Sequence, residues 1–377
     1  MKVGVPKETA ERERRVALVP EVVGKLTAED HEVVVQSGAG AGAMIPDELF
    51  SEAGATVTDS ESDVWGADVV VKVAKPSAEE IGKLGSDSVL IGFLSPLTAP
   101  DTIKGLAAAG ATAFALEAVP RISRAQSMDA LSSQSNVAGY RAALLGADKM
   151  GRFYPMLMTA AGTIRPAKVM VLGAGVAGLQ AIATARRLGA VVVGFDVRAA
   201  VKEQVESLGA TFLELDLGED AEGEGGYAKE LTSEQQQLQR EKLAEAMTDV
   251  DVVITTALIP GRPAPLLVTE QAVKNMKPGS VVVDMAGEAG GNCELSEPGE
   301  TVVKHDVTIT APLDLPSTMA EHASQLYARN IQSLLDLLVD DDGKLALDFD
   351  DEVVAGACVV RDGEIVHEGA KKAAAPA

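Results

Sequence analysis

Residues 168–180, which read KVMVLGAGVAGLQ, decide the fold. An apolar, strand-like stretch, Lys168–Leu172, runs into the pattern G-x-G-x-x-G, and a helical pattern then continues to Leu188. In this context the glycines allow a tight turn, the approach of a pyrophosphate to the backbone, and close packing of helix on strand. The helix N-terminus would face the phosphate charge. The stretch predicts a dinucleotide-binding turn; the alternative is a glycine-rich packing turn. The glycines are Gly173, Gly175 and Gly178.

The next strand-like stretch, Val191–Asp196, ends in an acid. A carboxylate at this position accepts both hydroxyls of an adenosine ribose and repels a 2′-phosphate, which favours NAD over NADP. Arg198 leaves that preference open, because an arginine nearby accommodates a 2′-phosphate. The alternative for Asp196 is a solvated strand end.

Strand-like and helix-like segments alternate on both sides of this turn, which predicts parallel sheets covered by helices on both faces. The strands expected in the first third are Lys2–Pro6, Glu32–Gln36, Asp68–Val73, Ser88–Phe93 and Thr112–Leu116. Those expected from the glycine turn onward are Lys168–Leu172, Val191–Asp196, Thr211–Leu215, Val250–Thr255, Ser280–Asp284 and Val307–Thr310.

The length of 377 residues suggests two domains. We expect an α/β protein of two Rossmann-like domains with parallel sheets, the first made of residues 1–134 with 320–377 and the second, the NAD-binding domain, of residues 135–319. The chain would cross near Gln134–Phe153 and return through a helix over Ser317–Leu338, so that two crossing helices flank a cleft. The end, Lys371–Ala377, is expected to lack regular structure.

Charge and cysteine content exclude several classes of protein. The 33 basic and 56 acidic residues give a formal net charge of -23, which disfavours nucleic-acid and anionic-membrane binding. Two cysteines without a CxxC pair argue against a disulfide framework and a zinc site, so we expect no metal. The longest uncharged run, Val169–Ala185, falls short of a membrane span, and the start lacks the apolar stretch of a signal peptide. We expect a cytoplasmic protein.

Residues 121–136, RISRAQSMDALSSQSN, are unusually polar for this chain. They follow a predicted strand, at the edge where α/β sheets place ligands, and offer donors and acceptors suited to a nicotinamide amide and its ribose. The alternative is a solvated linker in which Asp129 or Ser127 caps a helix.

Residues 218–232 form a glycine- and glutamate-rich insertion between a strand and a helix. Long loops of this kind often serve as lids, and Tyr227 is suited to pack on a bound nucleotide. The alternative is a disordered acidic surface loop.

Four runs of sequence resemble the NAD-binding α subunits of proton-translocating NAD(P) transhydrogenases, and the resemblance extends from Met1 to about Asp340. The opening and the dinucleotide fold are shared with alanine dehydrogenases, whereas the second run is specific to transhydrogenases. The runs are VGVPKETAERERRVALVP (3–20), PRISRAQSMDALSSQSNVAGYRA (120–142), VMVLGAGVAGLQAIATARRLGAVVVGFDVR (169–198) and GGYAKELT (225–232).

The resemblance implies roles for individual residues. The nicotinamide end of NAD(H) is surrounded by Arg121, Gln126, Asp129 and Ser132, and the first three act at the reacting ring, with Gln126 on the side approached by the partner's NADP. The ribose acid is Asp196, flanked by Val197 and Arg198. The lid carries Gly226 and Tyr227. Further cofactor contacts are Gly175, Val176, Gln239 and Leu258.

The resemblance also implies the reaction: hydride passes directly from NADH on this chain to NADP⁺ bound by a partner subunit, coupled to proton translocation in a membrane-spanning subunit. A homodimer, peripheral to the inner or plasma membrane through those partners, is expected. Direct transfer between two nicotinamides needs no acid–base residue.

Two other functions stay open at this point. An alanine dehydrogenase would need an acid–base histidine after the strand Ser88–Phe93, where this chain has Ser95, and a lysine near Ala74. A non-catalytic NAD-binding module would bind the nucleotide without transferring hydride.

Overall fold

The computed structural model describes residues 1–216, 231–259, 261–340 and 342–375. It divides into two compact units: unit 1, Met1–Gln134 with Pro316–Ala377, and unit 2, Ser135–Leu315. The chain passes from unit 1 to unit 2 inside helix α6 (Ala130–Lys149), and returns in the short 3-10 turn Leu315–Met319.

Unit 1 is built on an eight-stranded sheet in the order β17-β16-β6-β5-β4-β1-β2-β3. Strands β1 to β6 are parallel, and β16 and β17 add an antiparallel edge beside β6. The strands are β1 (Lys2–Val5), β2 (Glu32–Gln36), β3 (Thr56–Thr58), β4 (Val69–Val71), β5 (Val89–Gly92), β6 (Thr112–Ala115), β16 (Cys358–Arg361) and β17 (Glu364–Ile365).

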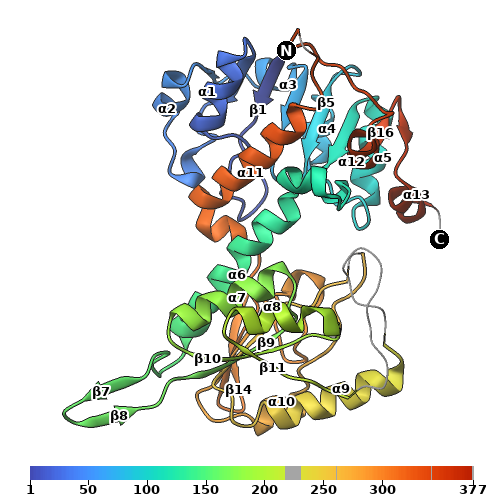
Figure 1. Ribbon diagram of the computed structural model, residues 1–377. Coiled ribbons are helices and arrows are strands. Elements are labelled where there is room, and N and C mark those ends of the chain that lie inside the picture. The colour runs from blue at the N-terminus through green and yellow to red at the C-terminus, as the bar shows by residue number, and fades with distance from the viewer. Residues whose placement is uncertain (217–230, 260, 341, 376–377) are drawn as a thin grey trace. The chain divides into compact units, whose positions relative to one another are not determined.

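Helices cover both faces of this sheet, as Figure 1 shows. Val69 and Val71 face one apolar cluster while Val70 faces the other, which explains why β4 reads as an unbroken valine run. The first cluster contains side chains of α1 (Pro20–Ala28), α2 (Asp47–Glu52), α11 (Ala320–Leu335) and α12 (Glu352–Ala357). The second contains side chains of α3 (Glu61–Trp65), α4 (Ala78–Ile81), α5 (Pro100–Ala109) and α13 (Glu368–Ala374).

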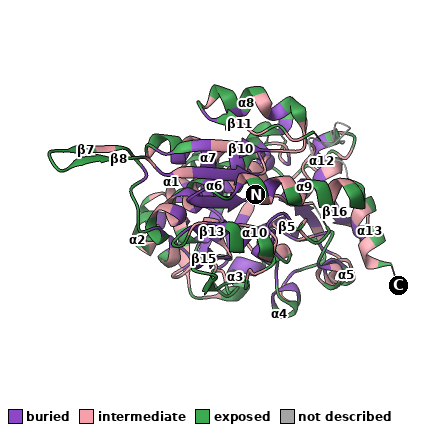
Figure 2. Ribbon diagram, turned by 90° about the horizontal axis from the view of Figure 1, so that it is seen from below, coloured by how far each residue is buried: buried purple, intermediate pink, exposed green. Residues whose placement is uncertain are grey.

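Unit 2 is built on a seven-stranded sheet in the order β11-β10-β9-β12-β13-β15-β14, parallel except for β14. The strands are β9 (Lys168–Leu172), β10 (Val191–Phe195), β11 (Thr211–Phe212), β12 (Val252–Thr255), β13 (Val281–Asp284), β14 (Thr301–Lys304) and β15 (Val307–Thr310). The helices are α6, α7 (Val176–Arg187), α8 (Lys202–Ser207), α9 (Ser233–Ala246) and α10 (Glu270–Asn275). All four residues of β13 and three of the five residues of β10 are buried, and Figure 2 colours buried residues purple.

The six parallel strands of each unit, numbered along the chain, lie in the order 3-2-1-4-5-6 of a dinucleotide-binding fold. The strand order reverses between β1 and β4 in unit 1 and between β9 and β12 in unit 2. Ligands of such sheets bind at the carboxyl ends of the strands beside this reversal. The predicted α/β class with two mostly parallel sheets is therefore confirmed.

One prediction about local structure is wrong. Of the stretch Lys371–Ala377, where we expected no regular structure, Lys371–Ala374 belong to helix α13, because the His367 side chain accepts a hydrogen bond from Ala370 N and Ala370 is buried against the unit 1 core. Among the described residues, no helix is long and apolar enough to cross a membrane.

Candidate nucleotide site and family

The glycine turn joins β9 to α7, and its glycines meet different surroundings. Gly173 has a φ of +104°, and a Cβ there would lie 2.5 Å from Thr256 Oγ1. A Cβ on Gly178 would lie 1.8 Å from the Gly173 carbonyl oxygen, so this glycine is required for helix and strand to pack. A Cβ on Gly175 would meet no heavy atom within 4 Å. The space above Gly175 is thus open, as the approach of a pyrophosphate requires.

Asp196 lies directly after β10 and reaches back to the turn. Its Oδ2 atom accepts a hydrogen bond from Ala174 N at 2.8 Å. The same carboxylate forms a two-point ion pair with Arg198, whose Nε and Nη2 atoms lie 2.8 Å from Oδ1 and Oδ2 respectively. The sequence indicated both residues, but only the structure shows that they are bonded to each other.

The remaining predicted contacts of unit 2 differ in exposure. Val176, the first residue of α7, is 39% exposed, and Leu258, which follows β12, is 51% exposed. Val197 is half-buried, whereas Gln239 is buried on α9. Since β9 lies between β10 and β12, the glycine turn, Asp196 and Leu258 all follow strands at the reversal of strand order. Gly226 and Tyr227 lie outside the described residues.

The polar run belongs to unit 1, so each group of predicted site residues is described within its own unit. Residues Ser123–Met128 form a 3-10 helix that is anchored by the buried side chains of Ala125 and Met128. Asn330 on α11 donates to the Ser127 carbonyl oxygen at 2.8 Å. These contacts fix the backbone while Arg121 and Gln126 remain exposed.

Asp129 and Ser132 are bonded to each other. Asp129 stands just before α6, and its carboxylate accepts from Ser132 N at 2.8 Å and from Ser132 Oγ at 2.5 Å. Asp129 therefore caps the helix, as the linker interpretation predicted. Because capping fixes the orientation of the Asp129 carboxylate, the cap is compatible with a role of Asp129 in binding a ligand.

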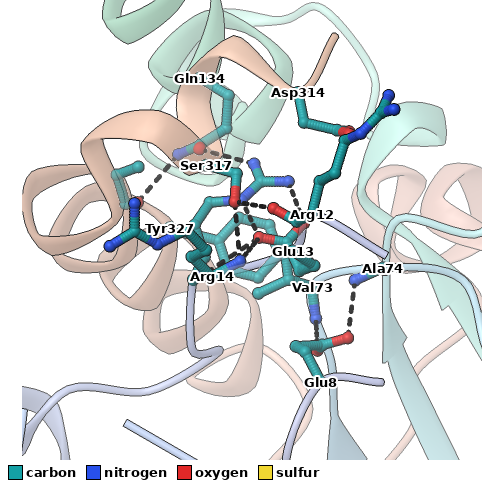
Figure 3. A network of polar contacts seen from close by, with 12 residues as sticks. Glu8, Arg12, Glu13, Arg14, Val73, Ala74, Gln134, Asp314, Ser317 and Tyr327 are labelled. Atoms are coloured by element: carbon teal, nitrogen blue, oxygen red, sulfur yellow. Dashed lines mark hydrogen bonds and ion pairs between the residues drawn. The ribbon is translucent and has the colours of Figure 1, made fainter. Parts of the chain in front are cut away.

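A buried polar network beside this helix start was not predicted (Figure 3). Arg15 donates to Glu13 through Nε at 2.8 Å and to Gln134 Oε1 on α6 at 2.9 Å. Ser317 Oγ accepts from Arg14 N at 2.7 Å. Burial by itself would raise the pKa of Glu13, but the bonds and charge of Arg15 hold that pKa below its ordinary value. The opening loop thus holds the first turns of α6 in place.

A second buried cluster surrounds a lysine at the end of β4. Lys72 is 1% exposed, and its ammonium lies 3.1 Å from Glu8 Oε2 and 3.0 Å from Glu80 Oε1. Glu8 also accepts from Val73 N at 2.6 Å. With both carboxylates bound to it, Lys72 is a structural ion rather than an exposed acid–base group.

The structure places no histidine directly after β5, where an alanine dehydrogenase would need its acid–base group. Ser95 follows β5 with a φ of +52°, and Glu117 accepts hydrogen bonds from Ser95 N at 2.8 Å and Leu94 N at 3.1 Å. None of the four histidines directly follows a parallel strand: His31 precedes β2, His305 lies in the β14–β15 turn, His322 is exposed on α11, and His367 caps α13.

Two family models match the chain. The model described as "Alanine dehydrogenase/PNT, N-terminal domain" matches residues 4–138, and "Alanine dehydrogenase/PNT, C-terminal domain" matches residues 142–368. Together they span most of both units.

Individual relatives narrow this result. The chain is 52% identical over 376 residues to an NAD(P) transhydrogenase alpha-subunit protein of Rhodospirillum rubrum, covering 97% of this chain and 98% of that protein. It is 32% identical to an alanine dehydrogenase of Mycolicibacterium smegmatis, covering 99% and 96%. The crystal structure of a transhydrogenase from Sinorhizobium meliloti matches with a TM-score of 0.85 and 45% identity, covering 98% of this chain and 99% of that one. The chain belongs to the alanine dehydrogenase/PNT family and, within it, to the NAD(P) transhydrogenase alpha subunits.

Proposed function

We propose that this chain binds NAD(H) on unit 2 and passes hydride directly to NADP⁺ held by a partner subunit. The open space above Gly175 carries the proposal, since an N-terminal helix turn with room for a pyrophosphate is the part of the fold that binds dinucleotides. The NAD-binding domain, expected over residues 135–319, then corresponds to unit 2, Ser135–Leu315. Asp196 holds the adenosine ribose, and the turn holds the phosphates.

The polar run of unit 1 is the proposed support for the nicotinamide ring. Arg121 and Gln126 are exposed, and the capped Asp129–Ser132 pair offers fixed oxygen atoms. These residues would orient the ring so that its C4 atom meets the second nicotinamide near van der Waals contact with water excluded. The protein supplies geometry, and the nucleotides carry the reacting atoms.

The partners follow from this reaction. NADP(H) would be bound by a separate subunit, and a membrane-spanning subunit would couple transfer to proton movement. This chain would then lie in the cytoplasm at the membrane surface. The Rhodospirillum rubrum relative is likewise named as one portion of an alpha subunit, which describes a component of a larger enzyme.

We also propose a homodimer. Strands β7 (Leu157–Thr159) and β8 (Gly162–Ile164) form a two-stranded hairpin that pairs with neither large sheet. Its apolar side chains are exposed: Met158 by 75% and Ile164 by 48%, with Met156 beside them at 56%. Isolated hairpins are marginally stable in water. A second copy of the chain would cover these side chains.

The test of the reaction mixes the purified chain, NADH, an oxidised NADP analogue and an NADP-binding partner subunit, and follows reduction of the analogue. Reduction that depends on both proteins supports the proposal. Folded components without transfer would contradict it and leave a binding module. Oxidation of NADH by pyruvate plus ammonia with this chain alone would instead show an amino-acid dehydrogenase, which Ser95 and the positions of the histidines argue against.

A variant tests the positioning role in the same assay. Gln126→Asn shortens an exposed side chain by one methylene and keeps the amide. It should slow hydride transfer far more than it weakens NADH binding, because the ring is misplaced while the phosphate and ribose contacts remain. Equal losses in both would count against positioning.

A further inference from the structure

The Asp196 carboxylate carries four hydrogen bonds. Its Oδ1 atom accepts from Arg198 N at 2.9 Å and from Arg198 Nε at 2.8 Å. Its Oδ2 atom accepts from Ala174 N at 2.8 Å and from Arg198 Nη2 at 2.8 Å. Two of the four donors are therefore backbone amides that hold the acid to its own turn and to the glycine turn, and two belong to one guanidinium.

These four hydrogen bonds occupy all the acceptor positions of the Asp196 carboxylate. An ionised carboxylate has two oxygens with about four acceptor positions in total. A ribose diol brings two O–H donors, and each needs one of those positions. The backbone amides are fixed by the fold, so the hydroxyls find acceptors only where the guanidinium now sits.

We propose that the Arg198 guanidinium is an internal ligand of the ribose site, which the nucleotide must displace. The side chains are 16% exposed for Arg198 and 6% for Asp196, so the guanidinium is the more exposed member of the pair. The planar guanidinium makes two parallel hydrogen bonds to the carboxylate. The two hydroxyls of the ribose diol would replace these two bonds. This proposal rests on the nucleotide site proposed above.

The exchange has two consequences. Releasing the ion pair costs free energy on binding, so Arg198 weakens the affinity for NAD(H). The paired carboxylate also presents no bare negative charge to a 2′-phosphate, and the displaced guanidinium is a cation for it. Arg198 therefore narrows the discrimination between NADH and NADPH that Asp196 alone would give.

The test replaces Arg198 with methionine, which keeps much of the apolar stem of the side chain and removes its charge. In Arg198→Met the dissociation constant for NADH, measured by calorimetry, should fall about two- to fivefold, the range of a partly exposed ion pair. The ratio of NADPH to NADH dissociation constants should rise. Without nucleotide, the melting temperature of Arg198→Met should be slightly lower than that of the wild type. The increase in melting temperature on adding NADH should be larger for Arg198→Met than for the wild type.

Arg187→Met is the matched control, because Arg187 is exposed at the far end of α7 and its replacement changes the net charge equally. It should leave both dissociation constants unchanged. Arg198→Lys is the second variant, and it should shift affinity in the same direction by less, since an ammonium cannot make the two-point pair.

The outcomes separate two failures. If the wild-type chain binds no NADH, the proposed nucleotide site is wrong. If it binds NADH but Arg198→Met binds it more weakly, or the NADPH to NADH ratio falls, Arg198 is a direct contact of the nucleotide and the displacement proposal is overturned. Equal shifts in Arg187→Met would assign the effect to overall charge and overturn it as well.

Discussion

At the scale of single residues, the glycine turn separates a folding requirement from a binding requirement. Gly178 has no room for a methyl group, because a Cβ there would lie 1.8 Å from a carbonyl oxygen, whereas Gly175 has open space and a φ of -76° that any residue can adopt. The two positions therefore respond differently to the same substitution.

Gly175→Ala should leave the free energy of unfolding within about 1 kcal/mol of wild type, since alanine fits the backbone there. NADH affinity should drop by at least about tenfold, because the methyl group occupies the path of the pyrophosphate to the backbone. Denaturant titration and calorimetry measure the two quantities. Gly178→Ala is the contrasting control, and it should clearly lower the free energy of unfolding. Unchanged NADH binding in Gly175→Ala would argue against the turn as the phosphate site.

The ionisation of Glu117 makes the stability of the folded protein depend on pH. Burial raises the pKa of its carboxyl above the ordinary 4.5, although the Ser95 and Leu94 amides oppose this shift. A raised folded pKa means that its stabilising contribution is complete below the ordinary value and is lost as pH rises through the folded pKa.

Glu117→Gln removes that dependence on pH. The melting temperature of the variant minus that of wild type should therefore increase from about pH 4.5 to about pH 7, whatever its sign at either end. A difference that stays flat or decreases over this range would show that ionised Glu117 is not disfavoured in the folded protein.

At the scale of elements, most of the strands that the sequence predicts are buried on both faces, and β3, β14 and the β7–β8 hairpin, which it misses, are not. β2, β9 and β15 have the predicted ends, because a sheet covered on both sides requires a continuous apolar run. β3, β14 and the β7–β8 hairpin went unpredicted, since they are short and largely exposed and their sequences lack such a run.

The candidate site divides in the same way. The G-x-G-x-x-G pattern, Asp196 and the polar run are visible in the sequence because strand ends and glycine turns have local signatures. The Asp196–Arg198 pair and the Arg15–Gln134 bond depend on side-chain geometry and, for the second, on residues 119 positions apart, which no local pattern reports.

The hairpin gives a prediction at this scale. Met158→Asp places a charge among its exposed apolar side chains, and Val303→Asp does the same on the exposed β14, where Val303 is 67% exposed. Sedimentation should find the wild type and Val303→Asp dimeric and Met158→Asp shifted to monomer, because a charge in an apolar interface is costly. A dimer of unchanged strength in Met158→Asp would remove the hairpin from the interface.

At the scale of the whole molecule, two units with the same strand order contribute different features. Unit 2 has the glycine turn at its strand reversal, while the reversal of unit 1 is filled by the Lys72 ion pairs and its exposed polar run follows β6. Within the described ranges, neither unit places a histidine after a parallel strand. This division fits the proposed reaction, in which the chain orients the nucleotide and supplies no acid–base group.

Isotope transfer tests this account most directly. NADH deuterated at the transferred position of C4 is mixed in ordinary water with this chain, the NADP-binding partner and oxidised NADP analogue, and the reduced analogue is analysed by mass spectrometry. Direct transfer predicts one deuterium on C4 of each reduced analogue, since no side chain or water handles the hydride. Reduced analogue carrying hydrogen from the solvent would contradict the account.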